Sequence, residues 1–145
     1  MKYSGRFVVS GTARGEAVCG KRPLNTLASF LNALVTHSEQ GIIGDPNHDL
    51  FGTDVKGKIL VVPTTIGSTT AGLVFLEAIR QGIAPQAVVV REIDTLLAAG
   101  AILSAVWFNR VMPVVEVADQ TFWQTVRTGV QVALDPDAAT VEVLG

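Results

Sequence analysis

The residues best suited to chemistry in this sequence are Ser68 and its neighbours Thr65, Ile66, Gly67 and Thr69. They follow an apolar segment that ends at a proline and precede a second apolar segment with helical character. A turn in this position collects backbone N–H groups and hydroxyls at a helix N-terminus, where free amides and the helix dipole favour an anion. The loop is therefore predicted to hold a carboxylate or a phosphate and to present Ser68 to it.

A simpler interpretation of Ser68 stays open. Serine is among the commonest N-cap residues, and its hydroxyl could accept a hydrogen bond from an amide of the first helical turn. The run around it has neither the Walker A pattern nor the glycine pattern of dinucleotide-binding loops. The elements around the loop must therefore help to decide between the two roles.

Composition limits the kind of protein that carries this loop. The chain has 145 residues, 48% hydrophobic and 17% charged, with a formal net charge of −2. The length suits one domain over residues 1–145, and the low charged fraction predicts a surface buried against a partner. Because the sequence has no basic stripe and no apolar stretch long enough to span a bilayer, we expect a soluble, cytoplasmic protein without nucleic-acid or membrane partners.

The elements that position Ser68 follow from the apolar pattern. Continuous apolar runs predict strands over 58–62 and 87–90, of the kind buried in a parallel or mixed sheet. The segment 69–81 between them is predicted to be a helix buried on more than one side, with Gly82 as its C-terminal cap. Together these elements form one βαβ unit, in which Ser68 lies at the turn from strand to helix.

The rest of the chain also alternates between strands and helices, which predicts the α/β class. The remaining predicted elements are an N-terminal hairpin of strands 3–10 and 16–19, a helix over 24–35, a long loop over 40–58, a helix over 93–102, strands over 105–108 and 112–117, a helix over 121–127, and a hairpin of strands 131–133 and 140–143.

Other chemistry-bearing residues have structural alternatives. Asp45 and His48 could be an acid–base pair or two metal ligands, but a turn whose imidazole bonds to the backbone is favoured. Glu92 and Asp94 follow strand 87–90 at the carboxyl end, where α/β sheets place ligands, and Asp94 is favoured as a helix N-cap. The single cysteine, Cys19, is read as a small, partly buried apolar residue and supplies no cysteine metal cluster.

An ordered set of short motifs resembles the small swivel domain of the aconitase X family and spans nearly the whole chain. The motifs are Gly11-x-Ala13-x-Gly15-Glu16-Ala17, Pro23-Leu24, Gly41-x-Ile43-x-Asp45-x-x-His48-x-Leu50-x-Gly52, Gly57-Lys58-Ile59-Leu60-Val61-Val62-Pro63, Gly67-Ser68-Thr69, Ala84-Pro85-x-Ala87, Glu92-x-Asp94, Gly100-Ala101 and Pro113-Val114. The resemblance implies a single swivelling β/β/α domain like the mobile domain of aconitases.

The resemblance also implies a function. Two-chain members of the family are dehydratases (hydro-lyases), whose small subunit shares its site with a large subunit in a heterodimer or higher assembly. The large subunit carries the cysteines of an iron or iron–sulfur centre, so no cofactor is expected on this chain alone. By position, Ser68 matches the family's serine, thought to remove a substrate proton. A serine hydroxyl needs amides, the helix dipole and positive groups to act in this way.

Two positions depart from the family pattern. Ile66 stands where many relatives carry Lys or Arg, and Asn25 lies in a run that is Pro-Leu-Ser-Phe-Trp in many relatives. The missing cation favours a less charged substrate, so the sequence predicts cis-3-hydroxy-L-proline, with mevalonate 5-phosphate as the alternative. The candidate substrate contacts are Asn25 and the four neighbours of Ser68. A non-catalytic binding or structural swivel domain is a further alternative with the same fold.

Overall fold

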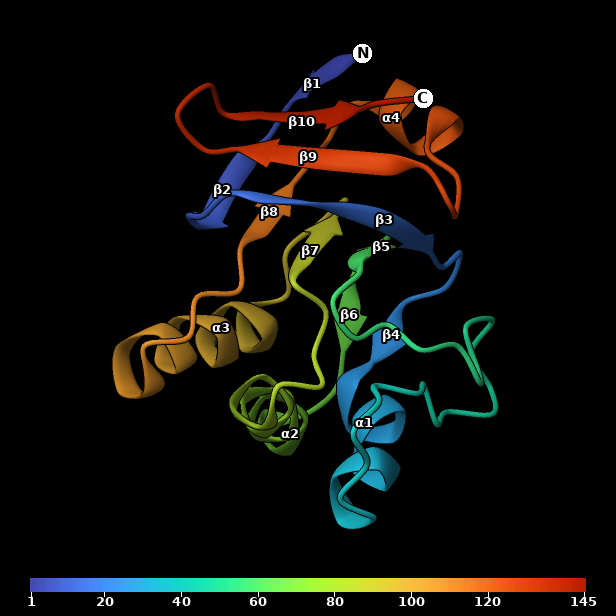
Figure 1. Cartoon of the computed structure of the whole chain (residues 1–145), viewed down its shortest axis with the longest axis vertical. Helices are drawn as coiled ribbons and strands as arrows, with labels where there is room; N and C mark the ends of the chain where they lie inside the picture. Colours follow the sequence, from blue (N-terminus) through green and yellow to red (C-terminus); the bar gives the residue numbers. More distant parts are fainter.

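An eight-stranded mixed sheet forms the centre of the computed structural model, which describes residues 1–145 (Figure 1). The strand order is β1-β10-β9-β3-β5-β7-β8-β2, and β4 and β6 form a separate two-stranded sheet. The strands are β1 Lys2–Ser4, β2 Arg6–Val9, β3 Ala13–Cys19, β4 Leu24–Asn25, β5 Ile59–Val62, β6 Thr65–Ile66, β7 Ala87–Val90, β8 Val114–Glu116, β9 Gln131–Asp135 and β10 Thr140–Val143. The helices are α1 Thr26–Val35, α2 Thr69–Gln81, α3 Thr95–Phe108 and α4 Gln120–Thr125.

The central strands are buried on both faces because alternate residues enter two different cores. Leu60 and Val62 of β5 pack in the core beneath α1, α2 and α3, whereas Ile59 and Val61 pack in a second core with Phe122 of α4. Such two-sided burial is typical of parallel strands, and β5 indeed runs parallel to both β3 and β7. In Figure 1 the three long helices lie below the sheet, and α4 lies at the opposite end with β9 and β10.

Helix α2 packs between α1 and α3, which is why it is apolar on most sides. Its contact with α3 depends on two glycines. A Cβ atom added to Gly100 would lie 2.9 Å from the carbonyl oxygen of Gly72, so the two backbones approach more closely than any side chain allows. This close contact packs the first turn of α2 against the N-terminal half of α3.

Several sequence predictions are confirmed. The α/β class is observed, and α2 and β7 have the predicted bounds. Gly82 ends α2 in the left-handed conformation at φ 78°. The C-terminal hairpin is the antiparallel pair β9–β10, and the helix predicted over 121–127 is α4. Residues 40–58 contain no named strand or helix. The prediction was accurate where apolar periodicity and a glycine cap point to the same element.

The predicted N-terminal hairpin is wrong. Residues 3–10 form two strands separated at Gly5, and neither pairs with β3. Instead β1 pairs with β10, β2 with β8, and β3 with both β9 and β5. Arg14 and Gly15, which precede the predicted second strand, lie inside β3, whose partners come from distant parts of the chain. Turn-forming residues indicated a local pairing, and long-range pairing overrode it.

Two other segments differ from their predicted form. Residues 105–108 are the last turn of α3 rather than a strand, and α3 ends at Asn109 in the left-handed conformation, φ 53°. Their β-branched and aromatic side chains favour strands, but the helical hydrogen bonding continues through them. Helix α1 begins at Thr26, and the two residues before it form β4, which matters for the site.

Candidate functional site

Ser68 is the N-cap residue of α2, yet its side chain caps nothing. Its backbone is extended, with φ −90° and ψ −176°, and its hydroxyl accepts no hydrogen bond from an amide of the first turn. The residue is exposed to solvent. The side-chain cap considered from the sequence is therefore absent, and the hydroxyl is free beside the unoccupied amides of the helix end.

Gly67 gives the loop its shape. Its φ is 138°, a conformation that residues with a side chain rarely adopt, and a Cβ atom there would lie 2.4 Å from Cβ of Ala71. Ala71 is 2% exposed in the packed first turn of α2 and has little room to move. The glycine therefore lets the chain fold tightly against α2 and orient Ser68 outward.

The small β4–β6 sheet places Asn25 beside the Ser68 loop. Asn25 pairs with Ile66 in parallel register, and its Oδ1 accepts a hydrogen bond from the Ala28 amide at 3.1 Å, which caps α1. The Asn25 side-chain amino group donates to no group of the chain. It remains available to a ligand next to Gly67, whose added Cβ would lie 3.7 Å from Asn25 Oδ1.

Thr65 has a different position from the other candidate contacts. It is 4% exposed, and its hydroxyl donates to Oδ2 of Asp94 at 3.1 Å. The other carboxylate oxygen of Asp94 accepts the Leu96 amide at 3.3 Å, so the predicted N-cap role of Asp94 is confirmed. Thr65 thus ties the loop to the start of α3, whereas Ile66 and Thr69 are exposed beside Ser68.

The long loop has a structural role at Asp45 and His48. Asp45 Oδ1 accepts the Asn47 amide at 2.9 Å, and the Leu50 amide donates to His48 Nδ1 at 3.0 Å. The ring proton therefore lies on Nε2, 2.9 Å from the carbonyl oxygen of Arg22. His48 is 6% exposed, and the predicted turn is confirmed. No three His, Cys, Asp or Glu side chains of the chain lie close enough together to hold a metal ion.

Asp49, the residue after His48, fixes the segment that follows β3. Its carboxylate accepts the amides of Lys21 at 2.8 Å and Arg22 at 3.2 Å. Burial would raise the pKa of Asp49, but these hydrogen bonds and the neighbouring His48 ring outweigh burial and lower the pKa below its ordinary value. The long loop therefore holds the backbone at Lys21 in place.

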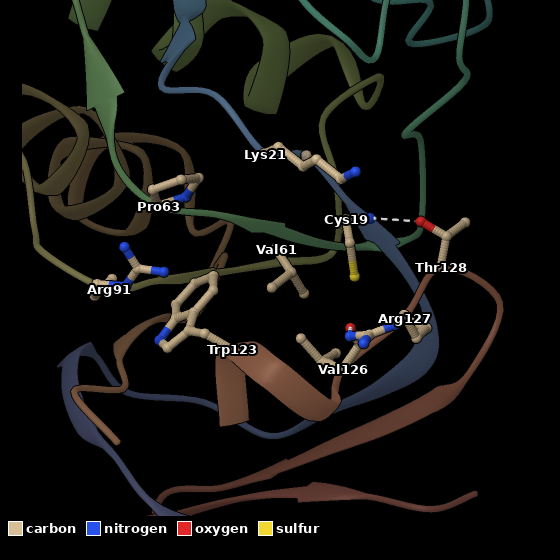
Figure 2. A pocket seen from close by; sticks show the side chains of 10 residues that line it. Cys19, Lys21, Val61, Pro63, Arg91, Trp123, Val126, Arg127 and Thr128 are labelled. Carbon is tan, nitrogen blue, oxygen red and sulfur yellow. Dashed lines mark hydrogen bonds between the residues drawn. The ribbon is translucent and has the colours of Figure 1, made fainter. Parts of the chain in front are cut away.

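A cavity of about 680 Å³ opens at the carboxyl ends of β3, β5 and β7 (Figure 2). Its lining residues are Cys19, Gly20, Lys21, Val61, Pro63, Arg91, Trp123, Val126, Arg127 and Thr128. In Figure 2, Arg91 and Trp123 lie on one side, with Cys19, Thr128 and Arg127 on the other. This pocket was not predicted from the sequence. Arg91 directly follows β7 and Lys21 lies two residues after β3, and the carboxyl ends of such strands commonly bind ligands.

The pocket is positively charged. Its lining includes Lys21, Arg91 and Arg127 but no Asp or Glu. Burial raises the pKa of the Cys19 thiol, and Thr128 and Arg127 offset this only in part, so the thiol is protonated at neutral pH. Cys19 is half-buried, as the sequence predicted, and supplies no thiolate nucleophile.

The aromatic residues of the sequence divide into core and surface. Phe122 is fully buried and Trp123 lines the pocket. Trp107 is 60% exposed and lies in a patch on and after α3, which we call the α3 apolar surface. Its residues are Ile102, Val106, Trp107, Phe108 and Val111. None of the helices combines the length and the apolar character needed to cross a bilayer.

The sequence profile of the family described as "Aconitase X swivel domain" matches residues 2–143. The chain belongs to the aconitase X swivel-domain family. Aconitase X from Thermococcus kodakaraensis, solved as a holo-form crystal structure, is 34% identical with a TM-score of 0.83, and the match covers 100% of this chain and 99% of that one. A solution NMR structure titled UPF0107 protein is 30% identical with a TM-score of 0.80, covering 100% of both chains. The predicted swivel fold is confirmed.

Curated aconitase X relatives have similar lengths. The phosphomevalonate dehydratase small subunit of Thermococcus kodakarensis is 36% identical, covering 99% of this chain and 97% of that protein. The protein of the same name from Pyrococcus abyssi is 35% identical over 100% of both, and that from Archaeoglobus fulgidus is 33% identical over 99% of both. The predicted class, a dehydratase subunit of the aconitase X type, is confirmed.

Proposed function

We propose that this chain is the small subunit of a dehydratase acting on mevalonate 5-phosphate, with Ser68 as the base that removes the substrate proton. The observation that carries the proposal is the free, exposed hydroxyl of Ser68 at the N-terminus of α2, in a chain whose relatives are named phosphomevalonate dehydratase small subunits. This substrate replaces cis-3-hydroxy-L-proline, the first expectation from the sequence, because the relatives fit the alternative better.

The surroundings of Ser68 suit a base that must bear negative charge. The amides of the first turn of α2 have no side-chain cap, and the positive end of the helix dipole lies beside the hydroxyl. Both stabilise an alkoxide at Ser68 Oγ when water is excluded. In the reaction, this oxygen takes the proton from the carbon next to the substrate carboxylate. The hydroxyl on the following carbon then leaves as hydroxide, and a double bond forms between the two carbons. Hydroxide and the proton released again from Ser68 combine to give water as the net second product.

The neighbouring side chains orient the substrate. Asn25 contributes the two N–H donors of its free amino group, and the exposed loop residues at 66, 67 and 69 contact the ligand by their backbone or side chains. Thr65 acts indirectly, because its hydroxyl is bound to Asp94 and fixes the loop against α3. Asn25, Ser68 and Asp94 are the N-cap residues of α1, α2 and α3. The N-termini of these three helices thus belong to one site.

A large subunit completes the site in this proposal. The α3 apolar surface supplies a docking face: Val106 is 72% and Trp107 is 60% exposed, and aromatic residues concentrate at protein interfaces. We assign the iron or iron–sulfur centre to that partner, since this chain offers no three-ligand cluster. Such a centre supplies Lewis-acid assistance to the departing hydroxyl.

The test is to co-express the chain with its large-subunit candidate and assay dehydration of mevalonate 5-phosphate and cis-3-hydroxy-L-proline. We expect turnover of the phosphorylated substrate only. Ser68→Ala should lower kcat by about 10²-fold or more, the usual contribution of a general base, without changing assembly of the complex. Ser10→Ala is the matched control, because Ser10 is an exposed serine that makes no side-chain hydrogen bond.

Two outcomes would contradict the proposal. Full activity in an assembled Ser68→Ala complex would remove Ser68 from the role of base. Turnover of cis-3-hydroxy-L-proline alone would return the substrate to the first sequence-based expectation. Unchanged folding of both variants, measured by circular dichroism, makes either result interpretable.

A further inference from the structure

We propose that the cavity at the carboxyl ends of β3, β5 and β7 is a phosphate-binding site, and that in the assembled enzyme it receives the phosphate of the substrate. Phosphate binding in this cavity is inferred from the pocket alone. Binding of the substrate's phosphate there rests on the proposed function, since it takes mevalonate 5-phosphate to be the substrate.

The charges of the pocket lack partners within the chain. Lys21, Arg91 and Arg127 line it, and none of them forms an ion pair, whereas Lys2, Arg6, Lys58 and Arg80 each pair with a glutamate elsewhere. The nearby carboxylate of Asp49 is occupied by two backbone amides and does not line the cavity. Three unpaired cations around one cavity repel one another, so an anion bound among them is stabilised.

The fold orients the two guanidinium groups and fixes the backbone that carries Lys21. The guanidinium of Arg91 lies 5.0 Å from the ring centroid of Trp123, a cation–π contact that orients it (Figure 2). Arg127 donates to the Val126 carbonyl at 2.8 Å, and the backbone of Lys21 is held by Asp49. The two guanidinium groups are thus oriented before a ligand arrives, which lowers the entropic cost of binding.

Neutral groups of the pocket also suit a phosphate. Thr128 Oγ1 accepts the Cys19 amide at 2.9 Å, and its own proton can turn from the Cys19 sulfur to a phosphate oxygen. The buried thiol of Cys19 is protonated and does not oppose an anion. Two guanidinium groups, an ammonium and a hydroxyl offer more donors than a carboxylate can use, whereas a phosphate dianion accepts from all sides. A volume of about 680 Å³ suits a small ligand rather than a polymer.

The pocket adjoins the Ser68 loop through the backbone. Pro63 lines the pocket and begins the connection to Ser68, and its carbonyl accepts the amides of Arg91 at 2.9 Å and Glu92 at 3.1 Å. The connection from β5 to α2 therefore borders the cationic pocket at one end and presents the proposed base at the other. One phosphorylated substrate could use both ends, with its phosphate among the cations and its reacting carbon at Ser68.

The first experiment titrates the isolated full-length chain with inorganic phosphate, using backbone NMR shifts at constant ionic strength, and repeats the titration with acetate. We expect saturable shifts at the pocket residues with phosphate and much weaker ones with acetate. Arg91→Gln and Arg127→Gln should each weaken phosphate binding about tenfold or more, the usual effect of losing one charge-assisted hydrogen bond. Arg14→Gln, which removes an exposed arginine without an ion pair, should leave it unchanged. Equal phosphate binding by all four proteins would overturn the site.

The second experiment identifies the source of the phosphate by steady-state kinetics on the co-expressed complex. If the substrate's phosphate occupies the pocket, Arg91→Gln and Arg127→Gln raise KM for mevalonate 5-phosphate about tenfold or more with kcat nearly unchanged, and inorganic phosphate inhibits competitively. Unchanged kinetics in variants that no longer bind phosphate would overturn the substrate assignment and assign the site to a separate phosphorylated ligand. A wild-type complex inactive on mevalonate 5-phosphate would refute the proposed function instead, while the titration still decides the phosphate site.

Discussion

Gly67→Ala tests whether the shape of the Ser68 loop depends on a missing side chain. The substitution forces an alanine into φ 138°, which costs about 1–3 kcal/mol. It also places a methyl group 2.4 Å from Cβ of Ala71, and overpacking of this kind costs about 1–3 kcal/mol more. We therefore expect the free energy of unfolding to fall by about 2–6 kcal/mol.

Thermal unfolding of the full chain, followed by circular dichroism, measures this effect. The unfolding entropy of a chain of 145 residues is about 0.3 kcal/mol/K, so Tm should fall by about 7–20 °C. Gly52→Ala is the matched control. Gly52 also has a positive φ of 82°, but a Cβ atom there meets nothing within 4 Å. Gly52→Ala should lower the free energy of unfolding only by the backbone strain of about 1–2 kcal/mol, and Tm by about 3–6 °C. Equal Tm values for the two variants would refute the clash with Ala71.

Three further predictions concern the supports of the site. Asp94→Ala should lower the free energy of unfolding by about 2 kcal/mol in urea unfolding, because α3 loses its cap and the buried Thr65 hydroxyl loses its acceptor. Asp94→Asn should recover most of this loss. Asp49→Asn should cost about 1 kcal/mol at pH 7. Because folding lowers the pKa of Asp49, that difference should be full above pH 3.8 and disappear as pH falls through the folded pKa, which urea unfolding across pH measures. Val106→Lys should leave Tm within about 2 °C but prevent co-purification with the large subunit, since Val106 is 72% exposed.

Short-range patterns were enough to predict the βαβ unit that carries Ser68. The apolar runs of β5 and β7, the buried helix α2 and its cap at Gly82 each depend on residues close together in sequence, and the structure has them at or near the predicted bounds. The N-cap role of Asp94 was also predictable, because an Asp before a helical segment has few better uses.

Pairing between distant strands was beyond such patterns. Residues 3–10 carry strong strand propensity, but nothing local indicates that β1 pairs with β10 and β2 with β8, at opposite edges of the sheet. The same limit explains why Asn25 was expected near the site only through the family resemblance. Its place beside Ile66 comes from the two-residue β4–β6 pairing, which is too short to leave a periodic signal.

The cationic pocket illustrates this limit most clearly. Ile66 stands where many relatives carry Lys or Arg, and this missing cation led to the expectation of a less charged substrate. The sequence shows only the neighbours of the loop along the chain. Parallel strands bring their carboxyl ends together whatever their separation along the chain, so Lys21 after β3 and Arg91 after β7 face one cavity, joined by Arg127 after α4. A cation missing from a loop therefore says little about the charge that a ligand meets, and only spatial neighbours of the loop can argue for or against a phosphorylated substrate.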